Sequence, residues 1–360
     1  MIKKKFWKNK KVLITGHTGF KGAWLSIILN ILGCKVYGYA LNPVGKKNFF
    51  QKAKLKKILK RDIRHDLRDI KFLKKELSII KPEIIIHLAA QSSVIESFKN
   101  PRNTVTTNVI GTYNLLESIK TSNVKCLLAI TTDKVYQNYE TAKYFDEESK
   151  LGGDDIYSGS KACCEILVHS YRKSFLKQSK CQVATARAGN CFGGGDWTED
   201  RIVKDCLETF YDNKVLVLRN PNATRPWQHV IEPLIGYLIL IQKLCSKKGK
   251  KYEGPWNFGP SLKQNLKVRK LVKIIQSSMN SKSKILVKRN YKKFKKVKIF
   301  ESKHLNINSR KVKKYLNWRP KLSIKEAVSL TVDWYNTYKE NKSLIKISQN
   351  QILEYLKKIS

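Results

Sequence analysis

A tyrosine and a lysine four residues apart, Tyr157 and Lys161, could together carry out proton transfer. They stand at the start of a helix that we predict over 158–175, where positions i and i+4 share one face. A nearby ammonium favours the phenolate and would lower the tyrosine pKa from about 10 towards the range of a general base. On its own, the pair could also be an ordinary surface pair on a helix.

A second group of reactive side chains follows the apolar run 125–131. Thr132, Asp133 and Lys134 present a hydroxyl, a carboxylate and an ammonium in succession. In an open parallel sheet, ligands bind outside the carboxyl ends of the strands, so these side chains are placed to touch a substrate. The alternative is an ordinary turn in which the aspartate is a cap.

Three glycines spaced three apart, Gly16, Gly19 and Gly22, follow the apolar residues 12–15 and open a predicted helix over 22–33. A turn without side chains lets backbone N–H groups approach phosphate, which the helix N-terminus attracts. The spacing differs from G-x-G-x-x-G, and such turns also arise for steric reasons. The strand before and the helix after nevertheless favour a dinucleotide.

One part of the usual dinucleotide site is missing from the sequence. An acidic residue normally follows the second strand and holds the ribose hydroxyls. Here residues 39–42 read Tyr-Ala-Leu-Asn, and the first carboxylate in the chain is Asp62. Spacing alone therefore does not separate NAD from NADP.

The elements that must position these residues alternate between short apolar runs and helical segments. Alternation of this kind predicts parallel strands with right-handed crossovers, a Rossmann-type doubly wound α/β sheet. Beyond about residue 190 the pattern loosens, and we expect a smaller, mixed α/β C-terminal domain. We predict strands at 12–15, 35–40, 83–88, 125–131 and 182–187, helices at 22–33, 104–120 and 158–175, and a division into 1–188, a partly interleaved 189–345 and a tail at 346–360.

Composition limits the class of protein. With 360 residues, 42% of them hydrophobic, the chain has ample material for a large core. Its eight cysteines include no C-x-x-C pair and no neighbouring histidines at ligand spacing, so we expect reduced thiols and no metal. No apolar stretch is long enough for a signal-peptide core or a membrane span, which favours a cytoplasmic enzyme without membrane association.

The formal net charge of +44 would ordinarily suggest nucleic acid or an anionic membrane as a partner. The lysines, however, are spread from end to end among many Asn and Ile residues, which is typical of the composition bias of an AT-rich genome. We therefore expect no nucleic-acid partner. An anionic substrate and cofactor would still be steered towards such a surface, with an effect that fades with salt.

Together these motifs resemble the extended short-chain dehydrogenase/reductase family of NAD-dependent epimerases and dehydratases. The resemblance covers about residues 7–338. Further matches are Asp66-Leu67, the runs at 87–91 and 108–112, and Arg187-Ala188-Gly189-Asn190. Within the family, the chain is most similar to the dehydratases that act on CDP-glucose, through GHTGFKGAWL (16–25), TTDKVYQN (131–138), GNCFGGGDWTEDRIVKD (189–205), NPNATRPWQHVIEPLIGYL (220–238) and WNFGP (256–260).

The resemblance implies NAD as the cofactor and assigns residues to it. Backbone N–H groups of the glycine turn would face the pyrophosphate, Asp66 and Leu67 would border the adenine, and Lys161 would hold the ribose hydroxyls and tune Tyr157. The turn comprises Gly16, Thr18, Gly19, Phe20, Lys21 and Gly22, and the path to the nicotinamide ribose would be lined by Leu88, Ala89, Ala90 and Gln91.

The resemblance also implies a reaction. Tyr157 would take the proton of the glucose 4-hydroxyl as hydride passes from C4 to NAD, with Thr132 hydrogen-bonded near O4. Water would then leave across C5 and C6, with Asp133 as the acid for the departing hydroxyl, and the hydride would return to C6. The product would be the CDP-4-keto-6-deoxy sugar used for surface polysaccharides such as O antigen.

Lys134 departs from the pattern of the related dTDP-glucose dehydratases, which have a glutamate at this place. A lysine could be the base for C5–H if its pKa falls. The alternative is that its charge stabilises the enolate-like intermediate.

For the substrate, the resemblance points to Asn190 and Arg225, and then to Arg201 and Arg219, as donors to the diphosphate, with His229 near the same pocket. It also implies a homodimer built on the helices at 104–120 and 158–175. Two other readings stay open, namely a different nucleotide-sugar dehydratase or 4-epimerase and a non-catalytic dinucleotide-binding protein. No single residue indicates the base preference.

Overall fold

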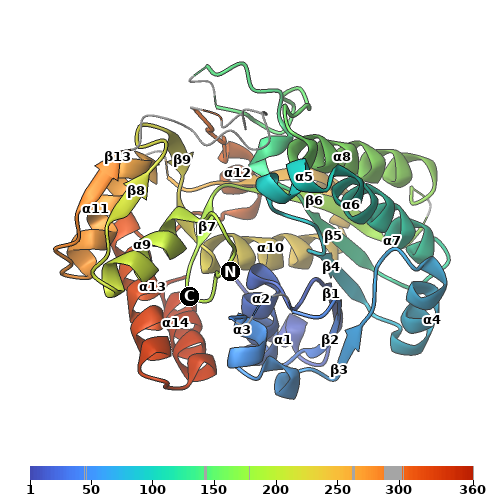
Figure 1. The fold of residues 1–360 in the computed structure, drawn as a ribbon. Helices are drawn as coiled ribbons and strands as arrows, with labels where there is room; N and C mark the ends of the chain where they lie inside the picture. Colours follow the sequence, from blue (N-terminus) through green and yellow to red (C-terminus); the bar gives the residue numbers. More distant parts are fainter. Residues whose placement is uncertain are drawn as a thin grey trace.

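The computed structural model describes residues 1–43, 45, 47–141, 144–177, 179–261, 264–287, 302 and 304–359. Its centre is a seven-stranded parallel sheet with the strand order β11-β6-β5-β4-β1-β2-β3 (Figure 1). This order confirms the predicted doubly wound α/β fold. The strands are β1 (Lys11–Thr15), β2 (Lys35–Ala40), β3 (Arg61–Arg64), β4 (Ile84–His87), β5 (Cys126–Ile130), β6 (Gln182–Ala188) and β11 (Gly254–Phe258).

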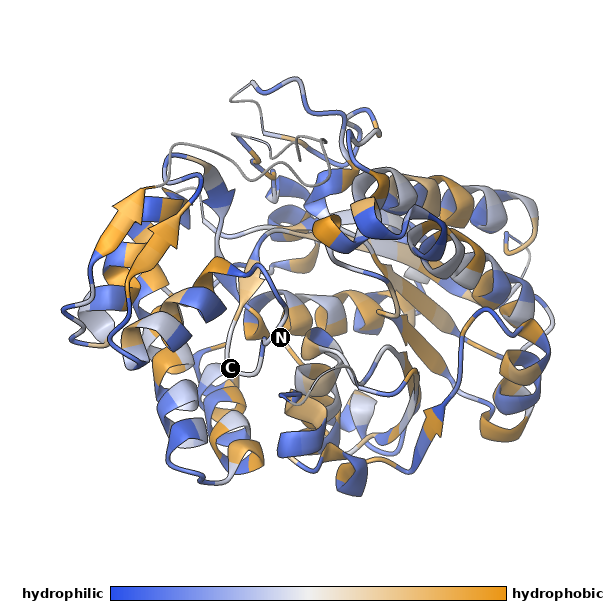
Figure 2. Cartoon of the chain, in the orientation of Figure 1, coloured by the Kyte–Doolittle hydropathy of each residue, from blue (hydrophilic) through white to orange (hydrophobic). Residues whose placement is uncertain are grey.

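Alternate residues of the central strands face two separate hydrophobic cores, because successive side chains of a strand point to opposite faces of the sheet. Val12 and Ile84 pack into one core, whereas Leu13 and Ile85 pack into the other. On the first face lie α2 (Phe20–Ile31) and α10 (Ile231–Leu244), and on the second lie α4 (Ile70–Ile80), α7 (Gly111–Ile119) and α8 (Ile156–Ser174) (Figure 1). Figure 2 shows the strands as the most hydrophobic layer of the molecule.

The helix predicted at 104–120 is interrupted. It consists of α6 (Pro101–Val105), a π-helical turn η2 (Thr106–Ile110) and α7. The turn holds Asn108, whose side chain accepts from the Gln91 backbone at 2.8 Å and donates to the Ser160 hydroxyl at 2.8 Å. Single π turns of this kind are frequent at functional sites. Here the π turn joins the loop after β4 to α8.

The two helices that begin at chemically important turns start earlier than predicted. Helix α2 begins at Phe20, directly after Gly19. Helix α8 begins at Ile156, because the Asp155 side chain accepts from the Ser158 backbone at 2.9 Å and caps the first turn. Tyr157 therefore lies in the first turn of α8 rather than before it.

A smaller mixed region follows β6 and packs against the carboxyl edge of the sheet. β11 returns from this region to the main sheet, so the two parts interleave. The segment set apart as a tail at 346–360 falls largely in α14 (Leu344–Lys358), where Ile352 and Tyr355 are buried. Elements of this region are β7 (Cys191–Phe192), α9 (Ile202–Tyr211), β8 (Leu216–Leu218), β9 (Thr224–Pro226), β10 (Gln228–His229), β12 (Asn265–Lys267), α11 (Val268–Ser278), β13 (Ile285–Val287), α12 (Arg310–Leu316) and α13 (Ile324–Lys339).

The remaining elements are short. They are α1 (Lys4–Trp7), α3 (Phe49–Lys52), η1 (Leu55–Ile58), α5 (Val94–Lys99), η3 (Asp133–Val135) and η4 (Gly249–Tyr252). In the described part of the chain, no helix is long and apolar enough to cross a membrane.

Candidate active site

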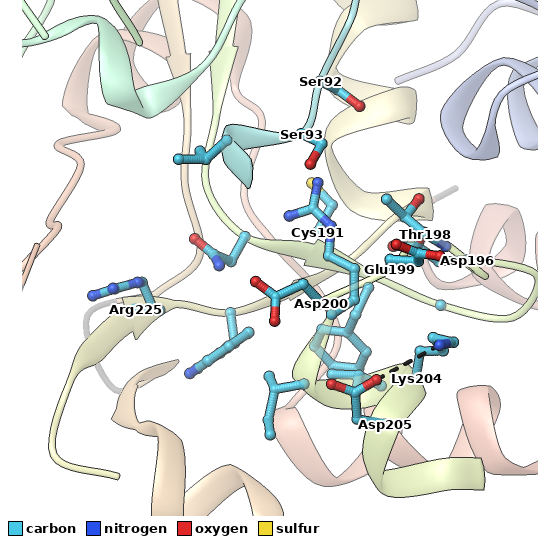
Figure 3. Close-up of a pocket in the computed structure, with 18 of the residues that line it drawn as sticks. Ser92, Ser93, Cys191, Asp196, Thr198, Glu199, Asp200, Lys204, Asp205 and Arg225 are labelled. Carbon is cyan, nitrogen blue, oxygen red and sulfur yellow. Dashed lines mark hydrogen bonds and ion pairs between the residues drawn. The ribbon is translucent and has the colours of Figure 1, made fainter. Parts of the chain in front are cut away.

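A cavity of about 480 Å³ lies beyond the carboxyl ends of β5 and β6, where the topology of an open α/β sheet places ligands. Figure 3 shows Ser92 and Ser93 at one end of it, Cys191, Asp200 and Arg225 around its middle, and Lys204 with Asp205 at the other end. The cavity brings together most of the residues predicted for catalysis and substrate binding, and these are Thr132, Asp133, Lys134, Tyr157, Asn190, Arg201, Arg219 and Arg225.

Asp133 occupies an unusual position in this cavity. It is only 4% exposed, its Oδ1 accepts from the Thr132 hydroxyl at 3.2 Å, and its Oδ2 has no hydrogen-bond partner among the described residues. Burial raises the pKa of Asp133 to about 6, although the charges of Lys134, Arg225 and Lys21 oppose the rise. A carboxyl group with this pKa can be protonated near neutral pH and can therefore donate a proton.

Tyr157 lies beside Thr132 and Asp133 in the same buried end of the cavity. Burial raises the pKa of Tyr157, while a hydrogen bond with Thr132 and the charges of Arg201 and Lys21 oppose the rise. The lowered pKa expected from Lys161 is therefore wrong. The physical reason is that desolvation of the phenolate outweighs the attraction of the surrounding cations.

Lys161 shares the inner face of α8 with Tyr157, as its spacing predicted, and is 4% exposed. Its Nζ donates to the Ile130 carbonyl at 3.1 Å, which anchors the side chain at the end of β5. Burial lowers the pKa of Lys161. The structure thus holds the lysine below the cavity and does not include it among the residues that line it.

The glycine turn is closely packed at two of its three glycines. A Cβ at Gly22 would come within 2.2 Å of the Gly16 carbonyl, and Gly16 has φ +77 with its own Cβ position 2.7 Å from the Ala89 backbone nitrogen. A side chain at either place would clash with backbone, whereas a Cβ at Gly19 would meet only the Gly16 carbonyl, at 3.4 Å. Gly16 and Gly22 therefore allow the tight turn that opens α2, where a helix N-terminus attracts phosphate and where Thr18, Phe20 and Lys21 lie.

Asp62 does not supply the carboxylate that is missing after β2. It lies on β3 below the glycine turn, with Oδ1 2.8 Å from His17 Nε2 and Oδ2 2.9 Å from Arg64. Burial lowers the pKa of His17 to about 4, although the hydrogen bond with Asp62 opposes this. The carboxylate is thus used within the fold.

Two segments border the place predicted for the adenine and ribose. Asp66 pairs with Arg68 at 2.6 Å, and the hydrogen bond from Arg68 lowers the pKa of Asp66. The buried Leu67 lies against Gly111. Leu88, Ala89, Ala90 and Gln91 follow β4 next to the glycine turn, where the Ala89 backbone donates to Thr15 Oγ1 at 3.3 Å.

The four residues predicted for the diphosphate all line the cavity, but their settings differ. Arg225 is buried and donates to the Thr224 carbonyl at 2.9 Å. Arg219 is half exposed and forms an ion pair with Asp200. Arg201 precedes α9 and Asn190 follows β6.

His229 does not reach the cavity. Its ring is 1% exposed and packs edge-on against Trp24 at 5.8 Å between centroids. Burial lowers the pKa of His229 to about 3. The substrate contact expected of this histidine is therefore not supported, because aromatic packing separates it from the cavity.

Sequence reasoning missed one contribution. Lys21 was expected to use only its backbone, yet its side chain lines the cavity and its charge acts on Tyr157, Asp133 and Lys161. A lysine inside the glycine motif was the available signal. Among the described residues, no group of three or more His, Cys, Asp or Glu is placed to hold a metal ion.

Comparison with known proteins places this geometry in a family. The family described as GDP-mannose 4,6 dehydratase matches residues 13–331. The CDP-glucose 4,6-dehydratase of Salmonella typhimurium is 37% identical over 99% of both chains, and the dTDP-D-glucose 4,6-dehydratase of Homo sapiens is 27% identical over 91% of this chain and 90% of that one.

Solved structures agree on the fold. A dTDP-glucose 4,6-dehydratase from Bacillus anthracis in complex with NAD superposes with a TM-score of 0.75 at 22% identity, covering 93% of this chain and 99% of that one. A UDP-glucose 4-epimerase from Thermotoga maritima gives 0.77 at 21% identity, covering 91% and 99%. With a family match over most of its length and a relative at 37% identity, the chain belongs to the GDP-mannose 4,6 dehydratase family.

Proposed function

We propose that the protein is an NAD-dependent nucleotide-sugar 4,6-dehydratase that converts CDP-glucose to CDP-4-keto-6-deoxyglucose and water. The observation that carries the proposal is the buried carboxyl of Asp133 beside Thr132 and Tyr157, whose Oδ2 has no hydrogen-bond partner among the described residues. A C4 epimerase needs a base and a cofactor but has no use for a second acid at this place. Loss of water from C5 and C6 needs an acid for the leaving hydroxyl.

The turn of Gly16, Gly19 and Gly22 suits a dinucleotide, because Gly16 and Gly22 allow a tight turn from β1 into α2 that larger residues could not form, and a helix N-terminus attracts phosphate. When bound, NAD would accept the hydride from C4 of the sugar and return it to C6. The backbone N–H groups at the start of α2 would hold the pyrophosphate, and Lys21 would place a positive charge between the cofactor turn and the catalytic end of the cavity.

The catalytic roles follow from the placement of the side chains. Tyr157 accepts the proton of the 4-hydroxyl, and Thr132, which hydrogen-bonds with it, orients the same oxygen. The charges of Arg201 and Lys21 favour the phenolate and oppose, without outweighing, the effect of burial on the pKa of Tyr157. Asp133 then donates its proton to the departing 6-hydroxyl.

Lys134 lines the cavity and is half-buried. We propose it as the base that removes the C5 proton, which becomes acidic once C4 carries a keto group. If its charge alone stabilises the intermediate, Lys134→Gln would lose less activity than Lys134→Glu.

CDP-glucose is favoured over other nucleotide sugars because the relative that acts on it shares 37% identity over 99% of the chain. The test incubates the purified protein with NAD and CDP-, dTDP-, GDP- or UDP-glucose and measures the alkali-induced absorbance of a 4-keto-6-deoxy sugar. We expect a signal with CDP-glucose and no net NADH. Silence with all four sugars, or interconversion at C4 without loss of water, would overturn the proposal.

We also propose a cytoplasmic homodimer. All eight cysteines are free, as expected in a reducing compartment. The outer faces of η2, α7 and α8 expose Ile110, Tyr113 and Ile166, which would suit a bundle of helices from two subunits. Light scattering that finds monomer and no dimer at micromolar concentration would exclude this proposal.

A further inference from the structure

One end of the cavity contains a carboxylate that the proposed mechanism does not use. Figure 3 shows Asp205 and Lys204 at the opposite end from Ser93. Cys191 lies nearer the catalytic end, where the charges of Lys21 and Asp133 act on it. A nucleotide sugar with its sugar at Tyr157 and its diphosphate near Arg219 and Arg225 would place its base at this far end.

The surroundings of Asp205 suit a flat heterocycle. Apolar residues from three elements also line the cavity, namely Leu207 on α9, Val217 and Leu218 on β8, and Val268 at the start of α11. The helices α9 and α11 pack together, and α9 also packs on β8. Asp205 is the carboxylate of α9 that lines the cavity.

The polar contacts of Asp205 leave its carboxylate available. Among the described residues, the charged group within ion-pair distance is Lys204, with Nζ 3.7 Å from Oδ1. Lys204 lies closer to Glu208, at 3.3 Å. Arg219 is instead paired with Asp200. The side chain of Asp205 is 38% exposed, so a ligand can reach it.

A carboxylate close to the diphosphate would be unfavourable, because two anions repel. It can, however, distinguish cytosine from uracil and thymine, because the bases carry different groups at one ring position. Cytosine carries an exocyclic amino group, which donates hydrogen bonds and for which a carboxylate is a fitting acceptor. Uracil and thymine carry a carbonyl oxygen at the same ring position, which a carboxylate repels.

We propose that Asp205 selects the nucleobase by accepting a hydrogen bond from the amino group of cytosine. The inference rests on the proposed function, since it places a CDP-sugar in this cavity. Discrimination arises from both attraction and repulsion, because the carboxylate that binds the amino group also disfavours the carbonyl of a uracil nucleotide.

The test compares kcat/KM for CDP-glucose and UDP-glucose, which differ only in the base, in the wild-type protein and in Asp205→Asn. An amide can accept from cytosine or donate to uracil, so we expect the preference for CDP-glucose to fall by about 10- to 100-fold. Asp205→Ser removes the carboxylate and shortens the side chain. We expect it to lose the preference mainly through a lower kcat/KM for CDP-glucose. Glu208→Gln is the matched control, because it removes a charge near Lys204 one turn away without lining the cavity.

Binding of CDP and UDP alone, measured by calorimetry on the same variants, separates this inference from the proposed function. Tighter binding of CDP by the wild-type protein, lost in Asp205→Asn and kept in Glu208→Gln, supports the inference even if no sugar is dehydrated. A CDP-to-UDP ratio in both aspartate variants within twofold of wild type would overturn the inference, while turnover of CDP-glucose would leave the proposed function intact.

Discussion

Two buried carboxylates near the carboxyl ends of β5 and β6 have opposite surroundings. Glu165 on α8 accepts from the Thr131 hydroxyl, from the Thr185 hydroxyl at 2.6 Å, and from Arg187 through Nε and Nη2 at 2.9 Å each. Asp133, two residues beyond Thr131, accepts only from Thr132, and its Oδ2 has no partner among the described residues. Both residues are 4% exposed.

The difference separates a structural charge from a functional one. A buried charge with a full set of donors holds neighbouring elements together, and Glu165 joins α8 to β5 and β6. Burial opposes the charge of Arg187, but its hydrogen bonds with Glu165 raise the pKa of Arg187. A buried carboxyl that lacks donors is destabilising unless protonated, and such groups gather at functional sites. The fold thus satisfies Glu165 with donors and leaves Asp133 Oδ2 without one among the described residues, which suits the role proposed for Asp133.

The largest expected effect comes from Asp133→Asn. An asparagine keeps the shape but cannot donate an acidic proton, so we expect kcat to fall by about 10²- to 10⁴-fold. Thermal unfolding of the same sample should show a folded protein of at least wild-type stability at neutral pH. A variant with more than a tenth of wild-type kcat would show that Asp133 is not the acid.

The second effect is on stability. Glu165→Gln leaves the buried Arg187 guanidinium without its counter-charge, so we expect the free energy of unfolding to fall by about 3–5 kcal/mol. Urea unfolding followed by circular dichroism measures the change. Glu340→Gln is the control, because Glu340 pairs with Lys342 on the surface and its loss should change little. A loss below about 1 kcal/mol in Glu165→Gln would remove the distinction between the two acids.

The contrast between these acids also shows how far the sequence can be interpreted. Strong local patterns predicted the sheet, since the apolar runs at 12–15 and 35–40 correspond to β1 and β2. A helix ending before Pro82 was also predicted, and it corresponds to α4 (Ile70–Ile80). Strand β3 was not predicted, because Arg61–Arg64 is charged. Its stability comes from pairing with β2, which only the tertiary structure supplies.

The candidate site was predictable where residues act in a local motif and not where they act at a distance. The residue types and spacing of Thr132, Asp133 and Tyr157 were enough to select them as candidates. The partners of Glu165 lie directly after β5 and on β6, and nothing in the sequence links Thr185 to it. His229 illustrates the opposite error, because its motif lies beside the cavity while its ring packs against Trp24.

The third prediction concerns pH. The folded-state pKa of Asp133 is about 6, against an ordinary value of 3.8, so the folded protein binds a proton more tightly than the unfolded chain. The stability that this proton contributes is present below about pH 4 and is lost as pH rises to about 6, by about 3 kcal/mol in total. As pH rises through this range, the unfolding free energy of the wild-type protein should therefore fall by this amount relative to that of Asp133→Asn, which has no carboxyl group at this position. A difference that stays constant from pH 4 to 8 would contradict the raised pKa.

The smallest effects separate two threonines, one beside each acid. Thr185→Val removes one donor to Glu165 Oε2, which still accepts from Arg187, so we expect a loss of about 1 kcal/mol in unfolding free energy and unchanged kcat. Thr132→Val should do the reverse, since Thr132 hydrogen-bonds with Tyr157 and Asp133 at the cavity. Its kcat should fall at least tenfold while its stability changes little. If both variants lost stability and neither lost kcat, the Thr132 hydroxyl would be structural, and the contrast between the two acids would not extend to the threonines beside them.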